Sequence, residues 1–507
     1  MRMRAFPLRW LFRLLALALL LAWAVSALWQ SQRRLPPGLH IVGPWQSSPA
    51  QEVRFLRDLT AADATGAPLV EQQIDDELLR MIGQAREFLV LDTGLFGDLP
   101  AAGPEAPRLR TARPLAAILA DALLAAKRAR PDLQVLLLFD PTSVQLAIGP
   151  TPLDRLRAGG IAVVPFAVGR LRSPNPVFAG GWRLCCRWWS KASAQGDLPN
   201  PLGVGPPGIS IGLWGRLQSF QRSHRQLLIG DDGAGALAGL IVSRAMNAEA
   251  GIHSATALYL GGRALEPMLE SELVLAQFSG WSGGGSMQER GQRLAERQRA
   301  LITPVADDMA RARVVSEAGI AEALIAALEA AGRGSSIDIA ALYLSQRELV
   351  RAILDAARRG AAIRILLDPG RDCYGYECSG LPNREVASEL VASSDGAVRV
   401  RWYRTHGEQF SPSVVLIRDA TRSWLLVGTA ELSRRDLDDF NLAAAFIAEL
   451  PAPAAASVDA LSWFDTLWYN RAEGGTEYSS DVDVYADASM LHYWEYRLLE
   501  ASGASFD

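Results

Sequence analysis

The sequence is poor in the residues that most often bind metal ions. It contains only five histidines and four cysteines in 507 residues, and none of them shows the spacing of a zinc site. The histidines are His40, His224, His253, His406 and His492. We therefore expect neither a bound metal nor another cofactor.

The chain also lacks a strong excess of charge of either sign. Its formal net charge is −4, so it gives no support for a nucleic-acid partner, which usually requires a strongly basic face. Apolar residues at 49% and charged residues at 21% are typical of a well-packed globular protein and not of a disordered one. A chain of 507 residues predicts two to four ordinary domains or one large two-lobed domain.

Charged residues are missing from Leu14 to Trp29, and four arginines precede this apolar run. Sixteen helical residues span roughly 24 Å, a little less than a ~30 Å hydrocarbon core, but Trp10 to Trp29 would suffice. We interpret residues 1–30 as a signal anchor; a signal peptide cleaved after Ala27 and a buried helix are the alternatives. The arginines place the N-terminus in the cytoplasm and the bulk of the chain on the extracytoplasmic (periplasmic) side, anchored in the membrane or secreted after cleavage.

The four cysteines fit either side of a membrane. Cys373 and Cys378, only five positions apart, could close a small disulfide loop after export. Cys185 and Cys186 are adjacent on an apolar stretch, and we interpret them as packing residues.

The same order of elements is predicted twice along the chain. In each half, a helix, a buried strand, a second helix and a second buried strand end in Asp-Pro, at Asp140-Pro141 and at Asp368-Pro369. Continuous apolar strands that alternate with helices indicate a mixed sheet flanked by helices, and hence an α/β fold. The predicted strands are residues 88–92, 133–139, 161–166, 337–342, 363–367 and 398–402, and the predicted helices are 71–86, 115–128, 321–331 and 348–359.

Residues 170–216 form a predicted insertion in the first half. Proline and glycine are frequent there, which favours a long ordered loop or lid. Within it, the apolar residues from Phe178 to Trp189 fall near helical spacing, with basic residues between them. This segment is either an interfacial helix that dips into a membrane surface or an amphipathic helix packed on its own domain.

Two related octets follow at corresponding places in the two halves. Residues 224–231 read His-Arg-Gln-Leu-Leu-Ile-Gly-Asp, and residues 411–418 read Ser-Pro-Ser-Val-Val-Leu-Ile-Arg. The first octet is close to the pattern His-x-Lys-x-x-x-x-Asp. With this pair and the stretches at 252–258, 404–410 and 428–439, the chain resembles the phospholipase D superfamily, within it the bacterial cardiolipin synthase-like branch, over about residues 50–507.

The resemblance implies two homologous phospholipase D-like halves, related by a pseudo-twofold axis, that bring one motif each to a shared cleft. We expect the first half to comprise residues 50–300, including the insertion 170–216, and the second half residues 301–507. The implied chemistry is phosphodiester hydrolysis or phosphatidyl transfer on phospholipids. One histidine attacks the phosphorus and the other protonates the leaving oxygen, while lysine, serine and asparagine side chains stabilise the phosphoryl oxygens without a metal.

Carried over to this sequence, the resemblance makes His224 a catalytic histidine and Asp231 its acidic residue. Gln226 stands where the family has lysine, and Ser243 matches a phosphate-binding serine. Arg225 is a further candidate for substrate contact, since arginine is a good phosphate ligand. Arg244 and Arg418 could supply missing positive charge in the same way.

The second octet keeps none of its three family residues. Ser411, Ser413 and Arg418 replace histidine, lysine and aspartate, and Glu431 stands in the place of an asparagine. His406 is the only nearby histidine that could serve as a substitute acid or base. We therefore expect a membrane-associated, phospholipid-directed protein whose family chemistry is impaired or lost. The alternatives are an active phospholipase D- or cardiolipin synthase-like enzyme that uses His224, and an envelope scaffold or phospholipid-binding protein.

Overall fold

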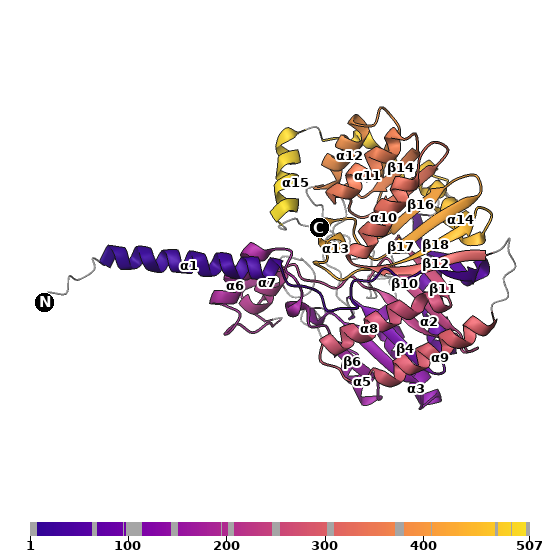
Figure 1. Ribbon diagram of the computed structural model, residues 1–507, viewed down its shortest axis with the longest axis horizontal. Coiled ribbons are helices and arrows are strands. Elements are labelled where there is room, and N and C mark those ends of the chain that lie inside the picture. Colours follow the sequence, from indigo (N-terminus) through magenta and orange to yellow (C-terminus); the bar gives the residue numbers. More distant parts are fainter. Residues whose placement is uncertain are drawn as a thin grey trace.

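Two large β-sheets form the body of the computed structural model (Figure 1). The structure describes residues 8–502 except 63–67, 95, 98–113, 143–150, 194, 201–206, 246–253, 302–308, 371–379, 407, 472–474 and 488. Cys373, Cys378 and His253 lie outside the described residues, so the predicted disulfide between the two cysteines stays a prediction.

Each sheet draws its strands from one half of the chain, apart from β1, which joins the second sheet. The first sheet contains, in spatial order, β3 (Pro68–Gln72), β2 (Val53–Ala62), β11 (Ala255–Gly261), β10 (Leu237–Val242), β9 (Leu227–Asp231), β4 (Phe88–Thr93), β5 (Gln134–Phe139) and β6 (Ala162–Pro165). The second contains β1 (Gln46–Pro49), β12 (Met309–Ser316), β18 (Ala444–Pro451), β17 (Arg422–Gly428), β16 (Ser413–Arg418), β13 (Ser336–Ala341), β14 (Ala362–Leu367), β15 (Val398–Tyr403) and β19 (Ser479–Asp481).

Seven strands of one sheet have counterparts in the other. The series β2-β11-β10-β9-β4-β5-β6 and β12-β18-β17-β16-β13-β14-β15 have the same order. In both series the last three strands are parallel and the other neighbours are antiparallel. The two octets consequently occupy matching strands, β9 and β16.

Helices cover the sheets, as predicted for a mixed α/β fold. The helices of the body are α2 (Gln73–Gln84), α3 (Leu115–Ala129), α5 (Leu153–Ala158), α8 (Glu266–Phe278), α9 (Gly285–Leu301), α10 (Ala318–Ala330), α11 (Arg347–Arg358), α12 (Asn383–Ala392), α13 (Arg434–Leu437), α14 (Ala455–Tyr469) and α15 (Met490–Ser502). One apolar cluster joins α2, α3 and α5 to the first sheet, and another joins α10, α11 and α12 to the second. A third contains residues of both sheets with α8, α9 and α14, so the two halves share a core. All six residues of β4 are buried, which explains its continuous apolar run.

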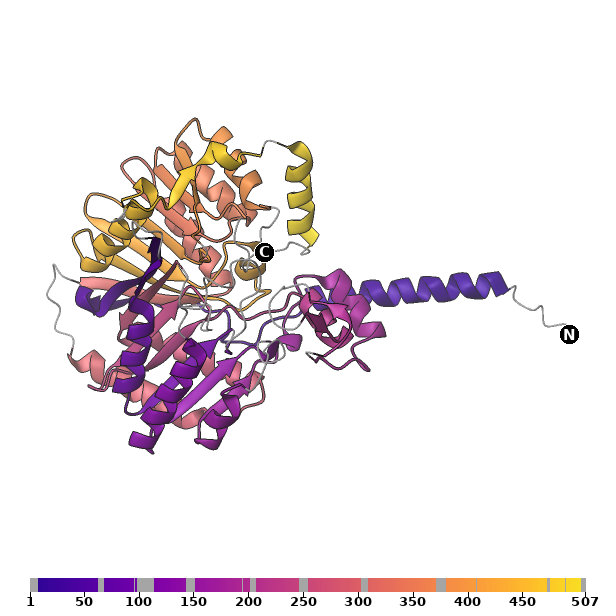
Figure 2. The same ribbon diagram turned by 180° about the vertical axis from the view of Figure 1, so that it is seen from behind.

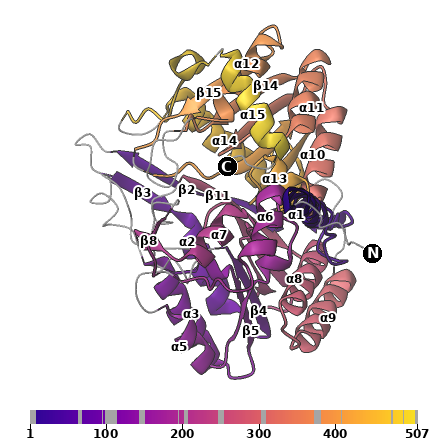
Figure 3. The same ribbon diagram turned by 90° about the vertical axis from the view of Figure 1, so that its left-hand side faces the viewer.

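A single long helix, α1 (Leu8–Ser31), projects from the body (Figures 1 and 2). It is apolar enough to cross a membrane by length and composition, and none of its apolar window is buried. Beside its C-terminal part lie α6 (Pro176–Cys185) and α7 (Ile211–Gln218) of the insertion. Figure 3, which views the molecule from the side where α1 projects, shows α6, α7 and α15 on that same side.

The insertion is more regular than the predicted loop or lid. Asn175 accepts a hydrogen bond from the N–H of Phe178 and caps α6, and Ser210 caps α7 in the same way. A short hairpin of β7 (Leu198–Pro199) and β8 (Gly208–Ile209) lies between the two helices. The expectation of a helix near Phe178 is confirmed, whereas α7 had no counterpart in the sequence analysis.

The interpretation of Cys185 and Cys186 as packing residues is wrong. The two cysteines form a disulfide with each other, at the end of α6. Cys185 is exposed and Cys186 is only half-buried, so neither fills a core.

Candidate functional site

His224 lies just before β9 and is held by residues of the second half. Its main-chain N–H donates to Leu442 O at 2.7 Å. Its ring Nδ1 is 2.9 Å from Oδ2 of Asp436, which is fully buried on α13. The octet histidine of the first half is therefore oriented by a carboxylate of the second half.

Asp436 is itself fixed on both oxygens. Oδ2 also accepts the main-chain N–H of Glu431 at 2.8 Å, and Oδ1 accepts Nδ2 of Asn441 at 3.1 Å. Asn441 Oδ1 in turn accepts the N–H of Arg222 at 3.0 Å, two residues before His224. The site is thus a closed network across the two halves.

The electrostatics of this network favour a protonated histidine. Burial lowers the pKa of His224, but the charge and hydrogen bond of Asp436 and the charge of Glu431 outweigh it and raise the pKa to about 9. The positive charge of the nearby Arg222 acts in the opposite direction and lowers this pKa. His224 is therefore an imidazolium at neutral pH.

Ser411 has the position in the second half that His224 has in the first. The N–H of Ser411 donates to Ser254 O at 2.9 Å, just as the N–H of His224 donates to Leu442 O. Ser223, which precedes His224, forms a parallel bridge with Leu442, and Phe410, which precedes Ser411, forms one with Ser254. The structure therefore places a serine where the second histidine of the motif pair would stand.

Gln226 and Ser243 lie at the same end of the first sheet as His224. Gln226 is partly exposed, like His224, while the residues on either side of it are buried, so the two side chains share a face. The main-chain N–H of Val242, next to Ser243, donates to Gln226 O. The hydroxyl of Ser243 accepts the N–H of Thr256 at 2.9 Å. The structure brings these two predicted residues to the neighbourhood of His224, with uncharged side chains.

Asp231 lies at the other end of β9. Its carboxylate accepts the N–H groups of Arg86, Glu87 and Phe88, at distances between 2.7 and 3.2 Å. The length of the strand puts it more than roughly 13 Å from the His224 end. Asp231 therefore fixes the start of β4, and the residue that orients the imidazole is Asp436.

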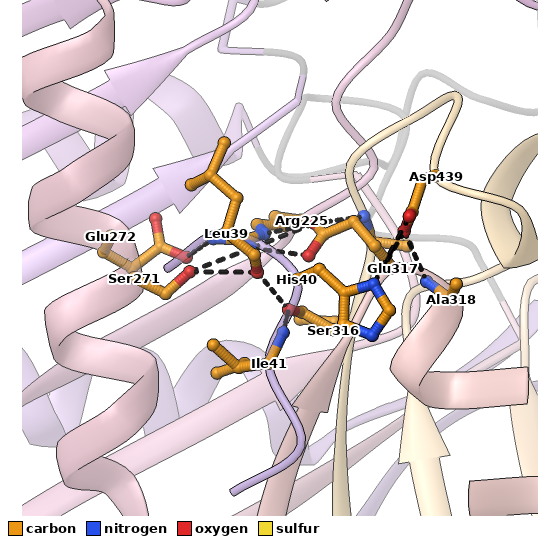
Figure 4. A network of polar contacts seen from close by, with 12 residues as sticks. Leu39, His40, Ile41, Arg225, Ser271, Glu272, Ser316, Glu317, Ala318 and Asp439 are labelled. Carbon is orange, nitrogen blue, oxygen red and sulfur yellow. Dashed lines mark hydrogen bonds and ion pairs between the residues drawn. The ribbon is translucent and has the colours of Figure 1, made fainter. Parts of the chain in front are cut away.

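Arg225 is buried in an ion-pair network and does not reach the surface (Figure 4). Its Nη1 is 2.8 Å from Glu272, and its Nε and Nη2 lie 3.0 and 2.9 Å from the two oxygens of Glu317. Nη2 also donates to Leu39 O and to Ser271 Oγ. Arg225 thus joins the first half, the second half and the segment after α1. The predicted contact of Arg225 with substrate is wrong, because its side chain is buried.

More carboxyl groups surround Arg225 than its single charge can balance. Burial raises the pKa of Glu317 to about 6, although Arg225 acts to lower it. Burial and the neighbouring Glu272 raise the pKa of Asp92 well above its usual range. Protons are therefore held in this network at a pH where surface carboxylates are ionised.

The other two candidate arginines are also paired within the fold. The buried Arg244 forms ion pairs with Asp58, at 2.8 Å, and with Asp75. Arg418 is 3.1 Å from Asp338. Neither shows a contact with the His224 network among the described residues.

His406 belongs to a different set of contacts. Its N–H donates to Glu408 Oε2 at 2.7 Å, and its Nδ1 lies 3.6 Å from Glu408 Oε1. Its ring packs edge-on against Tyr478, with 6.0 Å between centroids. Within the described part of the chain, no contact joins His406 to His224, so the structure does not pair the two histidines.

Two groups of described residues have ligand atoms close enough together to hold a metal ion. One is His224, Glu431 and Asp436, and the other is Glu385, Asp487 and His492, with all ligand atoms of a group within 4.8 Å of one another. In the first group the proton on His224 occupies the place that a cation would take beside Asp436. A metal would have to displace it, which becomes easier above the histidine pKa.

Comparison with known proteins agrees with the fold. Residues 324–468 match the family model described as the PLD-like domain of cardiolipin synthase. The structure is similar to phosphatidylserine synthase of Haemophilus influenzae, with a TM-score of 0.53 and 9% identity over 91% of this chain and 95% of that one. It also aligns with Nuc, a phospholipase D family member of Salmonella typhimurium, with a TM-score of 0.27 and 15% identity over 34% and 97% of the two chains. A search of curated protein sequences gave no match. Residues 324–468 therefore match a phospholipase D-like domain, and the chain as a whole shares its fold with that phosphatidylserine synthase.

The sequence analysis did not identify Asp436, whose carboxylate forms the hydrogen bond to the ring of His224. It stands in Leu432-Ser433-Arg434-Arg435-Asp436, five residues after Glu431. Two acidic residues so close to the expected asparagine position were the available signal. The pairing itself spans 212 residues of sequence and depends on the contact between halves, which no local pattern reveals.

Proposed function

We propose that this protein is a membrane-anchored member of the phospholipase D superfamily that binds phospholipid but has lost efficient phosphodiester chemistry. The environment of His224 is the observation that supports this proposal most directly. The nucleophile position is occupied by an imidazolium between Asp436 and Glu431, and the matching position in the second half is Ser411.

The expected loss of rate is large. A missing general acid alone costs roughly 10²- to 10⁴-fold. Each missing phosphate-binding cation removes an electrostatic contribution of about 10²- to 10³-fold. Gln226 and Ser413 occupy the two lysine positions, and the carboxylate of Glu431 would repel a phosphate. Together these changes leave no efficient route through the two-histidine reaction.

The membrane anchor is proposed from α1 and its contacts with the insertion. The Trp23 indole N–H donates to Val177 O at 2.8 Å, and the Ser26 hydroxyl donates to Gly180 O at 3.1 Å. Cleavage after Ala27 would remove this packing, so the contacts favour an uncleaved anchor over a signal peptide. The arginines before the helix favour an extracytoplasmic body.

A turnover assay tests the loss of chemistry. The full chain, reconstituted in bilayers with phosphatidylglycerol and cardiolipin, should convert neither lipid faster than its His224→Ala variant when products are measured by mass spectrometry. Conversion that His224→Ala abolishes would contradict the proposal. Carbonate extraction and N-terminal peptide mapping of the mature chain test the anchor separately.

One observation favours a second function, an active phosphodiesterase. Orientation of a histidine by a buried carboxylate is a pattern that activates groups in catalysis, and His224 with Asp436 has that geometry. In this case a phosphohistidine at residue 224 should accumulate when the reaction is quenched with substrate bound. Its absence in peptide mass spectra, with turnover also absent, would rule this function out.

A further inference from the structure

A cavity of about 380 Å³ lies between η3 (Val168–Arg170), α6 and α7, at the base of α1. Its charged lining residues are all basic: Arg170, Arg183, Arg187 and Arg216. Gln30, at the end of α1, and Trp182 also line the cavity. We call this site the arginine cavity; it does not contain the His224 network.

Arg216 feels the negative charge of Asp140, but the positive charge of the other three arginines in the arginine cavity is poorly balanced. Among the described residues, Arg170, Arg183 and Arg187 form no ion pair with a carboxylate; Arg170 donates to Phe278 O, and Arg183 lies 4.0 Å from the ring centre of Trp29. Arg33, whose guanidinium is also 4.0 Å from that ring, feels the same charges. Burial and the charges of Arg183 and Arg187 lower its pKa to about 10. An anion in the cavity would relieve this repulsion.

The position along α1 sets the depth of the cavity relative to a bilayer. A helix needs about 20 residues to cross the ~30 Å hydrocarbon core, and Trp10 to Trp29 supply them. Gln30, the next residue, lines the cavity, and Ser31 O accepts Nε of Arg172 beside it. The arginine cavity therefore lies at the level of the lipid headgroups, with Trp29 at the interface.

Other side chains on this side of the molecule fit the same level. Trp188 and Trp189, just after α6, are 78% and 51% exposed. On α15, which faces the same side in Figure 3, Leu491, Trp494 and Leu498 form an exposed apolar face. Exposed tryptophan and leucine beside arginines are typical of surfaces that rest on a membrane.

We propose that the arginine cavity binds the phosphate of an anionic membrane lipid headgroup. The inference rests on the anchor part of the proposed function and not on the state of the His224 network. Arginine suits this ligand because its planar group donates paired hydrogen bonds to phosphate oxygens. The insertion would thereby hold a lipid beside α1.

Binding by the full chain in a nonionic detergent tests the cavity. Calorimetric titration should show dihexanoyl phosphatidylglycerol binding more tightly than dihexanoyl phosphatidylcholine. Arg183→Gln with Arg187→Gln should weaken phosphatidylglycerol binding about 10- to 30-fold, because two cations that can pair with the phosphate are removed. Arg183→Lys with Arg187→Lys keeps the charge but not the paired hydrogen bonds, and should lose less affinity than the glutamine pair.

Matched variants separate the possible causes. Arg351→Gln with Arg399→Gln removes two exposed arginines of the second half and should leave binding unchanged. His224→Ala should also bind normally, which distinguishes this site from the proposed cleft. Equal affinity for the two lipids, an equal loss in the Arg351 and Arg399 control, or competition by inorganic phosphate at lipid-like concentrations would overturn the proposal. Lipid binding measured in detergent does not depend on turnover, so these outcomes would not contradict the proposed loss of chemistry.

Discussion

His224 Nδ1 and Asp436 Oδ2 lie 2.9 Å apart across the contact between the two halves. This relationship joins the histidine of the first octet to a residue that the family resemblance did not identify. It also changes the chemical state of the histidine, because the carboxylate stabilises the imidazolium. The contact therefore bears on stability and on reactivity, and the two effects can be measured separately.

Asp436→Asn should lower the pKa of His224 from about 9 toward the unfolded value of about 6.5. Because the pKa is raised in the folded state, the protonated form of His224 stabilises the fold. This stabilisation is fully present below pH 6.5 and is lost as the pH rises through 9. Since the ring is one-quarter exposed, we expect this effect to be about 2 kcal/mol. Histidine ring NMR titration, assigned with His224→Ala, gives the pKa directly. An unchanged midpoint in Asp436→Asn would show that another group sets it.

If the chain has lost phosphodiester chemistry as proposed, introducing the family residues should restore that chemistry, provided that the fold of the site is intact. A variant with Gln226→Lys, Ser411→His, Ser413→Lys and Glu431→Asn would supply both histidines and both lysines. We expect phosphodiester turnover at least about 100-fold above the unmodified chain. The same variant with His224→Ala should lose the gain. A folded but inactive restored variant would show that further residues of the site have changed.

The fold was largely predictable because its strands are apolar on both faces. The prediction of a strand at 88–92 and a helix at 115–128 agrees closely with β4 and α3. Burial between helix layers requires such continuous runs, so the sequence pattern follows from the architecture. The insertion was harder, because α6 and α7 are short and the packing of α6 on α1 is specified by Gly180 and Ala27, far apart in sequence.

The site was predictable only where the sequence kept the motif. His224 and Gln226 were found from the octet, and the strand pattern places them on one face. Arg225 was misjudged, since an arginine beside a motif histidine suggests a phosphate ligand, whereas Glu272 and Glu317 hold it in the core. Whether a charged side chain is buried depends on partners from other elements, and these partners lie 47 and 92 residues away.

Arg225→Met should destabilise the whole molecule. Removal of the guanidinium leaves Glu272 and Glu317 buried without their cation, and breaking a buried pair in this way costs about 3–5 kcal/mol. Denaturant unfolding followed by circular dichroism would report the loss. Arg351→Met on α11 is the matched control, because Arg351 is exposed. If both variants unfold at the same denaturant concentration, the network does not join the halves energetically.

Gly180→Ala should weaken the contact between α6 and α1. An added Cβ at Gly180 would lie 2.7 Å from the main-chain N of Ala27 and 2.9 Å from its Cα, so the helices must separate. Gly83→Ala on α2 is the control: nothing lies within 4 Å of its Cβ position, and replacing a helical glycine there should stabilise the protein by up to about 1 kcal/mol. Limited proteolysis at Arg183 and Arg187 in bilayers measures how firmly α6 is held. Faster cleavage in Gly180→Ala, but not in Gly83→Ala, is the expected result, and equal rates would show that α6 is held by contacts other than those with α1.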